Sequence, residues 1–231
     1  HWFGQDVSPL AGKELRTMSK SLLRSLATAS GNKVLKEKLK IKNKAALAEY
    51  LYGRDLLDVL KDCDKPGFIS VDSLANLLPS RSARAYLVAS CGAPEGGTGE
   101  SINLCIRDIA YEAFSRSHRG AASHSLCKAQ SGDQVKIFMR SNQDFWIDIK
   151  SAAPVLMIGE GTGIAPYIGF LQALENASEQ RQTMLIFGET SQDRDFLYQS
   201  QLAKWLEKGV LNTLKTGFST DSEQHYIQHA L

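Results

Sequence analysis

The chain has 231 residues, of which 43% are hydrophobic, so it is long enough for one large domain or two ordinary domains with a proper core. Its 27 basic and 25 acidic residues leave a formal charge of only +2, which does not indicate binding to nucleic acid or to an acidic membrane. The four cysteines form no CxxC pair, so we expect neither a zinc site nor a disulfide framework, and a reducing, cytoplasmic setting fits best. No apolar run approaches the roughly 20 residues of a membrane helix, and the start of the chain lacks a signal-peptide pattern.

Apolar residues on a helical period predict a helical segment at the start of the chain. The period is present from Lys13 to Ala29 and again from Ala45 to Val59. Between these stretches, Lys33 to Lys44 is rich in lysine, and we expect a solvated helix face or loop without a function of its own. Val71 to Leu78 is expected to be a short apolar helix.

The sequence then changes to short β-prone runs separated by glycine-rich or polar turns. Three such runs lie at Ala85 to Ser90, Ile102 to Ile109 and Gln134 to Met139. Runs of this kind are typical of an antiparallel sheet or barrel, so we expect part of a β-barrel over residues 81–150.

From Pro154 onward, predicted strands and helices alternate. The strands are Val155 to Ile158, Met184 to Phe187 and Val210 to Leu214, and the helices are Ala165 to Leu174 and Asp195 to Leu206. Such alternation indicates an α/β fold in which crossover helices connect the strands of a parallel, Rossmann-like sheet.

A glycine turn connects the first of these strands to its helix. It consists of Gly159, Glu160, Gly161, Thr162 and Gly163. Pro166 stands near the start of the helix, where its missing N–H costs little. Glycines let the backbone approach a diphosphate closely, while free N–H groups and the positive helix end stabilise its charge. On pattern alone, an anion site and a purely structural turn are equally open, and Glu160 would repel a diphosphate unless its side chain points to solvent.

Motifs on both sides of this turn resemble those of a known family. In chain order they are Arg84-Ala85-Tyr86, Gly120-Ala121-Ala122-Ser123, the glycine turn, Asp195-Phe196-Leu197-Tyr198-Gln199, and Ser219 with Tyr226-Ile227-Gln228. This order resembles the diflavin reductases, which include the flavoprotein component of NADPH-sulfite reductase and cytochrome P450 reductase. The resemblance implies a helical connecting region over residues 1–80, part of an FAD-binding barrel over 81–150 and an NAD(P)-binding domain over 151–231.

The resemblance also implies flavin-binding roles for residues before the turn. Arg84 would donate paired hydrogen bonds to the FAD diphosphate, and Tyr86 would lie against the flavin ring. A second helix start would face the diphosphate with its backbone N–H groups and a hydroxyl, at Gly120, Ala121, Ala122 and Ser123. Tyr111 matches an aromatic residue near the FAD, and the backbone from Cys105 to Arg107 lies where the nucleotide half of the flavin would pass.

Several positions depart from the family pattern. Leu87 stands where the family has a serine beside the reactive flavin nitrogen, so we expect slow flavin reduction or a differently placed ring. Arg107 replaces a glycine. Thr220 and Gln224 replace an arginine and a lysine that bind the 2′-phosphate of NADPH. Each lost charge-assisted hydrogen bond is worth roughly 1.5 to 3 kcal/mol, so NADPH should not be strongly preferred over NADH.

The rest of the implied NADPH pocket is retained. The matching residues are Ser219, Tyr226 and Gln228. His225 would add charge only when protonated. We find no counterpart of the first barrel strands or of the final strand of the family, and a barrel without its early strands would leave unpaired edges. Because the chain also begins without methionine, we expect either a fragment of a larger reductase or a shortened relative with decayed cofactor sites.

Three functions stay open. The first is an FAD-dependent oxidoreductase segment that takes electrons from NAD(P)H and passes them to a flavodoxin-like or iron-sulfur partner, with FMN on a domain outside this chain. The second is a non-catalytic reductase-like module for assembly or partner contact. The third is a simpler NADH-dependent reductase of the ferredoxin-reductase type, against which the helical insertion argues. We assign no catalytic side chain and no metal site, because no His-Cys-Asp arrangement suggests such chemistry.

Overall fold

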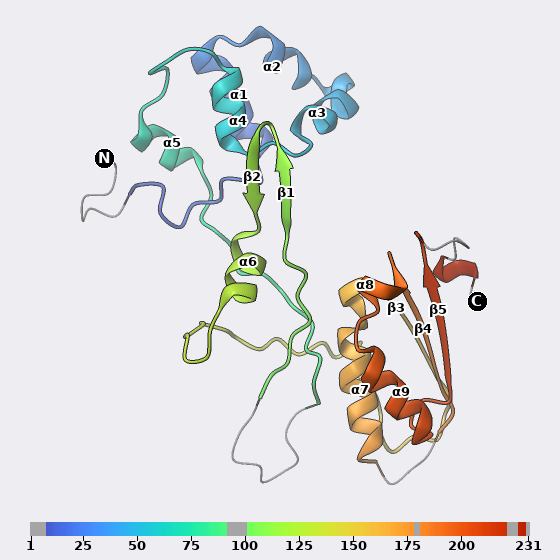
Figure 1. Ribbon diagram of the computed structural model, residues 1–231. Helices are drawn as coiled ribbons and strands as arrows, with labels where there is room; N and C mark the ends of the chain where they lie inside the picture. The colour runs from blue at the N-terminus through green and yellow to red at the C-terminus, as the bar shows by residue number, and fades with distance from the viewer. Residues whose placement is uncertain (1–7, 92–100, 178–180, 221–225, 230–231) are drawn as a thin grey trace. The chain divides into compact units, whose positions relative to one another are not determined.

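The computed structural model describes residues 8–91, 101–177, 181–220 and 226–229 (Figure 1). The chain divides into two compact units, and each unit contains two separate stretches of sequence. The first unit comprises residues 1–84 and 109–120, and the second comprises residues 85–108 and 121–231.

Short helices form most of the first unit. They are α1 (Lys20–Ser30), α2 (Lys33–Lys38), the 3₁₀ helix η1 (Ile41–Asn43), α3 (Lys44–Leu51), α4 (Leu56–Asp62) and α5 (Val71–Leu77). Their inward-facing leucines share one core, which includes Leu22, Leu23, Leu26, Leu35, Leu47, Leu56 and Leu74. Serine caps fix two of the starts, because Ser19 accepts a hydrogen bond from the Leu22 amide and Ser70 accepts one from the Ser73 amide. The predicted helical start of the chain is confirmed.

The helical period predicted from Ala45 to Val59 is divided between two helices, because the chain breaks between α3 and α4. Gly53 has a φ of +73°, a conformation that glycine adopts at little cost. Asp55 then caps the start of α4 in a capping box. The Asp55 side chain accepts a hydrogen bond from the Asp58 amide, and the Asp58 side chain accepts one from the Asp55 amide. The apolar period continues across the break because both helices bury residues in the same core.

A β-hairpin completes the first unit. Its strands are β1 (Ala110–Ala113) and β2 (Arg116–Arg119), which pair antiparallel. The two turn residues, Phe114 and Ser115, both have positive φ, as a type I′ turn requires. Arg116 donates to the carboxylates of Asp55 and Asp58 at 2.6 and 2.8 Å, and these ion pairs hold the hairpin against the start of α4.

A parallel sheet organises the second unit. Its strands are β3 (Val155–Glu160), β4 (Thr183–Glu189) and β5 (Thr213–Phe218), in the spatial order β3-β4-β5. The helices are α6 (Ala121–Lys128), η2 (Gly161–Ile164), α7 (Ala165–Glu175), α8 (Gln192–Asp195), α9 (Gln199–Glu207) and η3 (Ile227–His229). Helices α7 and α9 lie on one side of the sheet in Figure 1, and their apolar residues share a buried core with Leu185 and Phe187 of β4. The predicted α/β alternation is therefore confirmed.

Two boundaries in this sheet unit differ from the predicted ones. The helix predicted from Asp195 to Leu206 is interrupted, because Tyr198 has a φ of +57° and separates α8 from α9. The third strand begins after the predicted Val210 start. Leu211 instead closes the end of α9, where its amide donates to the Trp205 carbonyl at 3.0 Å and its side chain is fully buried.

The three β-prone runs between residues 85 and 139 form no strand in the described part of the chain, so these predictions are wrong there and no barrel is seen. The first two runs meet only at an isolated bridge between Val88 and Leu104. The third run leaves its apolar side chains exposed, and Phe138 is 76% exposed. High β-propensity reflects packing against neighbouring strands, and among the described residues these runs have no such neighbours.

Candidate functional site

The glycine turn lies between the end of β3 and the start of α7. Residues Gly161–Ile164 form η2, which continues directly into α7 with Pro166 in its first turn. The first N–H groups of a helix have no partner within the helix and carry its positive dipole end. The Glu160 side chain is exposed, so its carboxylate is solvated. The turn therefore has the strand, glycines and helix start that an anion site requires.

The outer glycines of the turn have different surroundings. A Cβ atom at Gly159 would lie 3.0 Å from the ring of Tyr167, whose hydroxyl donates to the Ile158 carbonyl at 2.9 Å. A Cβ atom at Gly163 would have no described atom within 4 Å. A side chain at Gly159 would thus press against the protein's own packing, whereas Gly163 borders open space.

An ion pair packs against the middle glycine of the turn. Gly161 has a φ of +55°, and a Cβ atom there would lie 3.2 Å from both Arg107 Nη2 and Glu189 Oε1. These two side chains form an ion pair, and the other Glu189 oxygen accepts from the Thr190 amide at 2.6 Å. Sequence reasoning missed Glu189, although a carboxylate at the end of a buried strand was a usable signal.

The ends of β4 and β5 bring two further predicted residues to the same edge of the sheet. The Ser219 amide donates to the Glu189 carbonyl at 3.0 Å. The Thr220 amide and hydroxyl both donate to the Thr190 carbonyl, at 2.9 and 2.7 Å. Because the strands are parallel, their carboxyl ends share one edge, and ligands of open α/β sheets bind at such edges.

The helix η3 carries the last predicted residues to this edge. A Cβ atom at Gly188 would overlap the Ile227 side chain, so a glycine in β4 is what allows η3 to pack there. Tyr226 and Gln228 flank Ile227, and both have exposed side chains. Gln224 and His225 lie outside the described residues.

Of the residues with predicted flavin roles, Arg84 belongs to the first unit and already has an acidic partner. It donates to Glu14 at 2.6 Å. Burial disfavours the charged form of Glu14, but hydrogen bonds from the Arg16 amide and the Arg84 guanidinium hold its pKa below the ordinary value. A diphosphate would therefore have to share Arg84 with Glu14.

Tyr111 and Gly120 also lie in the first unit. Tyr111 stacks on His118 with ring centroids 4.8 Å apart, and its hydroxyl accepts from Arg16 at 2.5 Å. The Gly120 amide donates to the Ile109 carbonyl at 2.7 Å. That amide is engaged by the backbone, so its predicted donation to a diphosphate is not supported by this geometry.

The other predicted flavin residues belong to the second unit. Tyr86 is partly buried, whereas Leu87 is 52% exposed. Ala121, Ala122 and Ser123 form the first turn of α6, as expected for a second helix start, and Ser123 is buried. The predicted flavin residues are thus divided between the two units.

The segment before Arg107 contacts an aromatic residue of the break between α8 and α9. Burial raises the pKa of the Cys105 thiol, and burial together with Cys105 raises the pKa of Tyr198 to about 12. Both groups are therefore protonated at neutral pH, which does not favour either as a nucleophile.

An acidic cluster in the first unit has the spacing of metal ligands. The ligand atoms of Asp55, Asp58 and His118 lie within 4.8 Å of one another. Arg116 donates to both carboxylates and already supplies the positive charge between them. We therefore interpret the cluster as an ion-pair network that joins the hairpin to α4.

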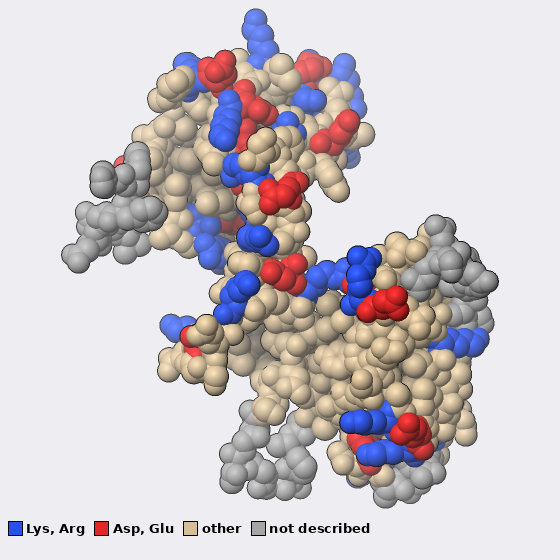
Figure 2. Space-filling model, in the orientation of Figure 1, with Lys and Arg blue, Asp and Glu red and all other residues tan. Residues whose placement is uncertain are grey.

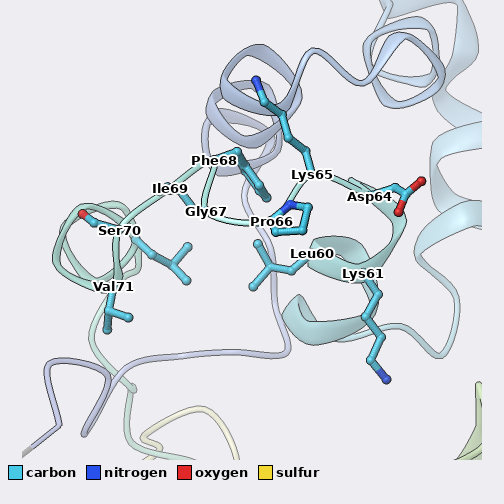
Figure 3. Close-up of a pocket in the computed structure, with 11 residues that line it drawn as sticks. Leu60, Lys61, Asp64, Lys65, Pro66, Gly67, Phe68, Ile69, Ser70 and Val71 are labelled. Atoms are coloured by element: carbon cyan, nitrogen blue, oxygen red, sulfur yellow. The ribbon is translucent and has the colours of Figure 1, made fainter.

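A cavity of about 420 Å³ lies beside the end of α4 and the start of α5 (Figure 3). Leu60, Pro66, Phe68 and Val71 give it apolar walls, and Lys61 and Lys65 stand among its lining residues. No residue with a predicted cofactor role lines this cavity, so we assign it no function.

The part of the chain that contains this sheet edge matches a known protein family. Residues 157–230 match the family model described as "Oxidoreductase NAD-binding domain". The chain is 32% identical over 234 residues to the sulfite reductase [NADPH] flavoprotein alpha-component of Bacillus subtilis (strain 168), covering 98% of this chain and 38% of that protein. The corresponding protein of Vibrio parahaemolyticus is 33% identical over 220 residues, covering 94% of this chain and 34% of the relative. The corresponding protein of Vibrio cholerae is 36% identical over 191 residues, covering 82% of this chain and 30% of the relative.

The fold and the family match define residues 157–230 as an NAD-binding domain of the oxidoreductase type. Over most of its length the chain is homologous to sulfite reductase flavoprotein alpha-components, which confirms the resemblance to this family of flavoproteins. The chain spans little more than a third of the length of these relatives, or less.

Proposed function

We propose that this chain is a segment of an FAD-dependent oxidoreductase that passes electrons from NAD(P)H through FAD to an FMN-containing, flavodoxin-like or iron-sulfur partner. The observation that carries the proposal is the sheet edge, where the glycine turn, the ends of β4 and β5 and η3 come together. We take residues 1–80 as the helical connecting region, 81–150 as part of the FAD-binding barrel and 151–231 as the Rossmann-like NAD(P)-binding domain.

The residues at this edge fit a nicotinamide nucleotide. The N–H groups at the start of η2, which continues into α7, would bind the diphosphate, and the open space at Gly163 would admit it. Thr162 lies between the glycines and is partly exposed, so its hydroxyl is accessible. Tyr226, directly before η3, and Gln228 within it would contact the adenosine half of the nucleotide.

The same edge does not favour NADPH over NADH. The Thr220 hydroxyl already donates to the Thr190 carbonyl, and it carries no charge to offer a 2′-phosphate. Ser219 remains as a neutral donor beside it. Without the charge-assisted hydrogen bonds of a guanidinium, the chain should accept both nucleotides.

The flavin fit is weaker than the nucleotide fit. In the first unit, Arg84 would bind the FAD diphosphate in competition with Glu14, and Tyr111 would offer a ring contact to the flavin. In the second unit, the first turn of α6 would supply donors, and Tyr86 would offer a ring contact. When bound, FAD supplies the chemistry that accepts a hydride and releases single electrons. Leu87 offers no hydrogen bond to this chemistry, so the protein's own contribution there is packing and water exclusion.

Charge distribution supports a redox partner. Residues 1–84 and 109–120 contain 17 Lys and Arg against 10 Asp and Glu, a formal charge of +7, whereas the second unit contains 10 against 15, a charge of −5. Lys and Arg are spread over the helical part in Figure 2. Such a basic unit suits an acidic electron-transfer partner, whose encounter it would accelerate.

We place the protein in a reducing, cytoplasmic setting, since all four cysteines are free. Among the described residues, no helix has the length and apolar character needed to cross a membrane.

The alternative is a non-catalytic module that keeps the fold for assembly or partner contact. Leu87 favours it, because an exposed aliphatic side chain stands where the chemistry calls for a hydroxyl. The absorption spectrum of the full protein after addition of FAD separates the two proposals. A flavin spectrum that survives gel filtration and bleaches with NADH supports the oxidoreductase. A protein that takes up no FAD supports the module.

A further inference from the structure

The Arg107 side chain lies at the glycine turn, although the family has a glycine at this position. It comes from the segment before β1 and reaches Gly161, where a Cβ atom would lie 3.2 Å from Arg107 Nη2. The positive φ and lack of a side chain at Gly161 create the space for this guanidinium.

Glu189 holds the guanidinium in this position. Its side chain is only 4% exposed, and its two oxygens are both engaged, one by Arg107 and the other by the Thr190 amide. The arginine side chain, by contrast, is 56% exposed. The ion pair therefore has an anchored acidic end and an accessible basic end.

The accessible end changes the electrostatics of the turn. The helix start provides only partial positive charge, and the neighbouring Glu160 provides a full negative one. A guanidinium has five N–H donors, and the ion pair with Glu189 involves the Nη2 group. Its other N–H groups are suited to phosphate oxygens, which accept paired hydrogen bonds from arginine.

We propose that Arg107 binds the diphosphate of the nicotinamide nucleotide at the glycine turn, and that Glu189 is the positioning residue that holds its guanidinium against Gly161. This inference rests on the proposed function. Arg107 would supply positive charge to the diphosphate of the nucleotide. This charge would offset part of the binding energy lost in the 2′-phosphate pocket, where two cationic residues of the family are absent.

Isothermal titration of the full protein with ADP-ribose tests the proposal, because ADP-ribose carries the diphosphate without the nicotinamide. Arg107→Ala should weaken ADP-ribose binding by roughly tenfold or more, and Arg107→Lys should lose part of the affinity, since lysine keeps the charge without the fork of donors. Glu189→Gln should also weaken binding, because the guanidinium loses its anchor. Raising the salt concentration should weaken the wild type more than Arg107→Ala.

A double variant, Arg107→Ala with Glu189→Gln, keeps the test valid if Arg107→Ala alone leaves an unpaired buried carboxylate and fails to fold. The matched control is Lys208→Ala, which breaks the ion pair with Glu175 at the far end of α7 and should bind ADP-ribose as the wild type does.

The inference is overturned if the wild type binds ADP-ribose and the folded double variant binds it with the same affinity. It is also overturned if the variants lose FAD affinity but keep ADP-ribose affinity, since Arg107 would then serve the flavin. A wild-type protein that binds no ADP-ribose would overturn the proposed function, and this inference with it.

Discussion

At the scale of single residues, Thr220 is the position that we propose to lie nearest the 2′-phosphate of NADPH. Its hydroxyl is committed to the Thr190 carbonyl at 2.7 Å, and its neighbour Ser219 has its amide on the Glu189 carbonyl. The position therefore lies at the sheet edge, where the proposed nucleotide would bind, but offers no positive charge. We expect nucleotide preference to follow the charge placed at this position.

Thr220→Arg should shift the ratio of NADH to NADPH dissociation constants toward NADPH by about tenfold, the effect of one charge-assisted hydrogen bond. Fluorescence titration of the full protein with each nucleotide measures this ratio. Thr220→Ala is the control, because it removes the same hydroxyl without adding charge and should leave the ratio unchanged. Equal ratios in the two variants would show that this position does not meet the 2′-phosphate.

Asp58 is the residue whose charge matters most for the first unit. Its side chain is 4% exposed, and it accepts from Arg116 and from the Asp55 amide. Burial opposes its ionisation, but these hydrogen bonds, led by that from Arg116, hold its pKa below the ordinary value of 3.8. Asp58 therefore stabilises the fold above that value, and its contribution is lost as the pH falls through the lower folded-state pKa.

Asp58→Asn should lower the free energy of unfolding at pH 7 by about 1 to 3 kcal/mol, because Arg116 loses a charged acceptor. Urea unfolding measures the difference, which should stay constant at neutral pH and shrink below pH 3.8. Glu112→Gln is the matched control, since Glu112 is exposed on β1 and should change stability little. If the difference in the free energy of unfolding stayed the same below pH 3.8, the effect of Asp58→Asn would come from altered packing and not from the lost charge.

At the scale of elements, the passage from β3 to α7 depends on three glycines with separate tasks. Gly159 makes room for Tyr167, and Gly161 makes room for the Arg107–Glu189 pair. Gly163 makes room for no described atom. The first two glycines are explained by the fold, so Gly163 is the position at which a ligand requirement can be separated from a folding requirement.

Gly163→Ala should leave the melting temperature unchanged or slightly raised, because an added methyl group meets no described atom and restricts the unfolded chain. The same variant should weaken ADP-ribose binding, since the methyl group would occupy space that the diphosphate needs. Thermal unfolding and calorimetric titration check the two effects. Unchanged affinity in a stable Gly163→Ala variant would mean that no diphosphate approaches the turn.

The elements also show how far the sequence predicts structure here. The β3–α7–β4 part could be predicted because an apolar strand, a glycine turn and a proline at the helix start are all local signals. The β1–β2 hairpin could not, because its type I′ turn is formed by Phe114 and Ser115 rather than by the usual asparagine and glycine. The break at Tyr198 was missed for a similar reason, since a tyrosine rarely has positive φ.

Long-range features of the candidate site were the hardest to predict. The glycine turn and the Ser219 to Gln228 segment were identified from motifs, and the structure brings their described residues to one sheet edge. Glu189 and its partner Arg107 are 82 positions apart, and no local pattern joins them. The predicted barrel strands failed because strand formation needs partners, whereas residues such as Ile137 have β-propensity alone.

At the scale of the whole molecule, the chain joins a basic helical unit to an acidic unit that contains the parallel sheet. The unit charges of +7 and −5 nearly cancel, so the total of +2 conceals both. A soluble acidic acceptor would meet the first unit favourably, while the nucleotide would bind at the sheet edge of the second.

The central claim is that the protein oxidises a nicotinamide nucleotide through a bound flavin. The most direct measurement is the oxidation of NADH and of NADPH by the FAD-saturated full protein, followed at 340 nm with ferricyanide as acceptor. We predict turnover with both nucleotides at comparable efficiency, and a lower rate in the Arg107→Ala variant. A complete lack of turnover with either nucleotide, in a protein that has taken up FAD, would contradict the claim and favour the non-catalytic module.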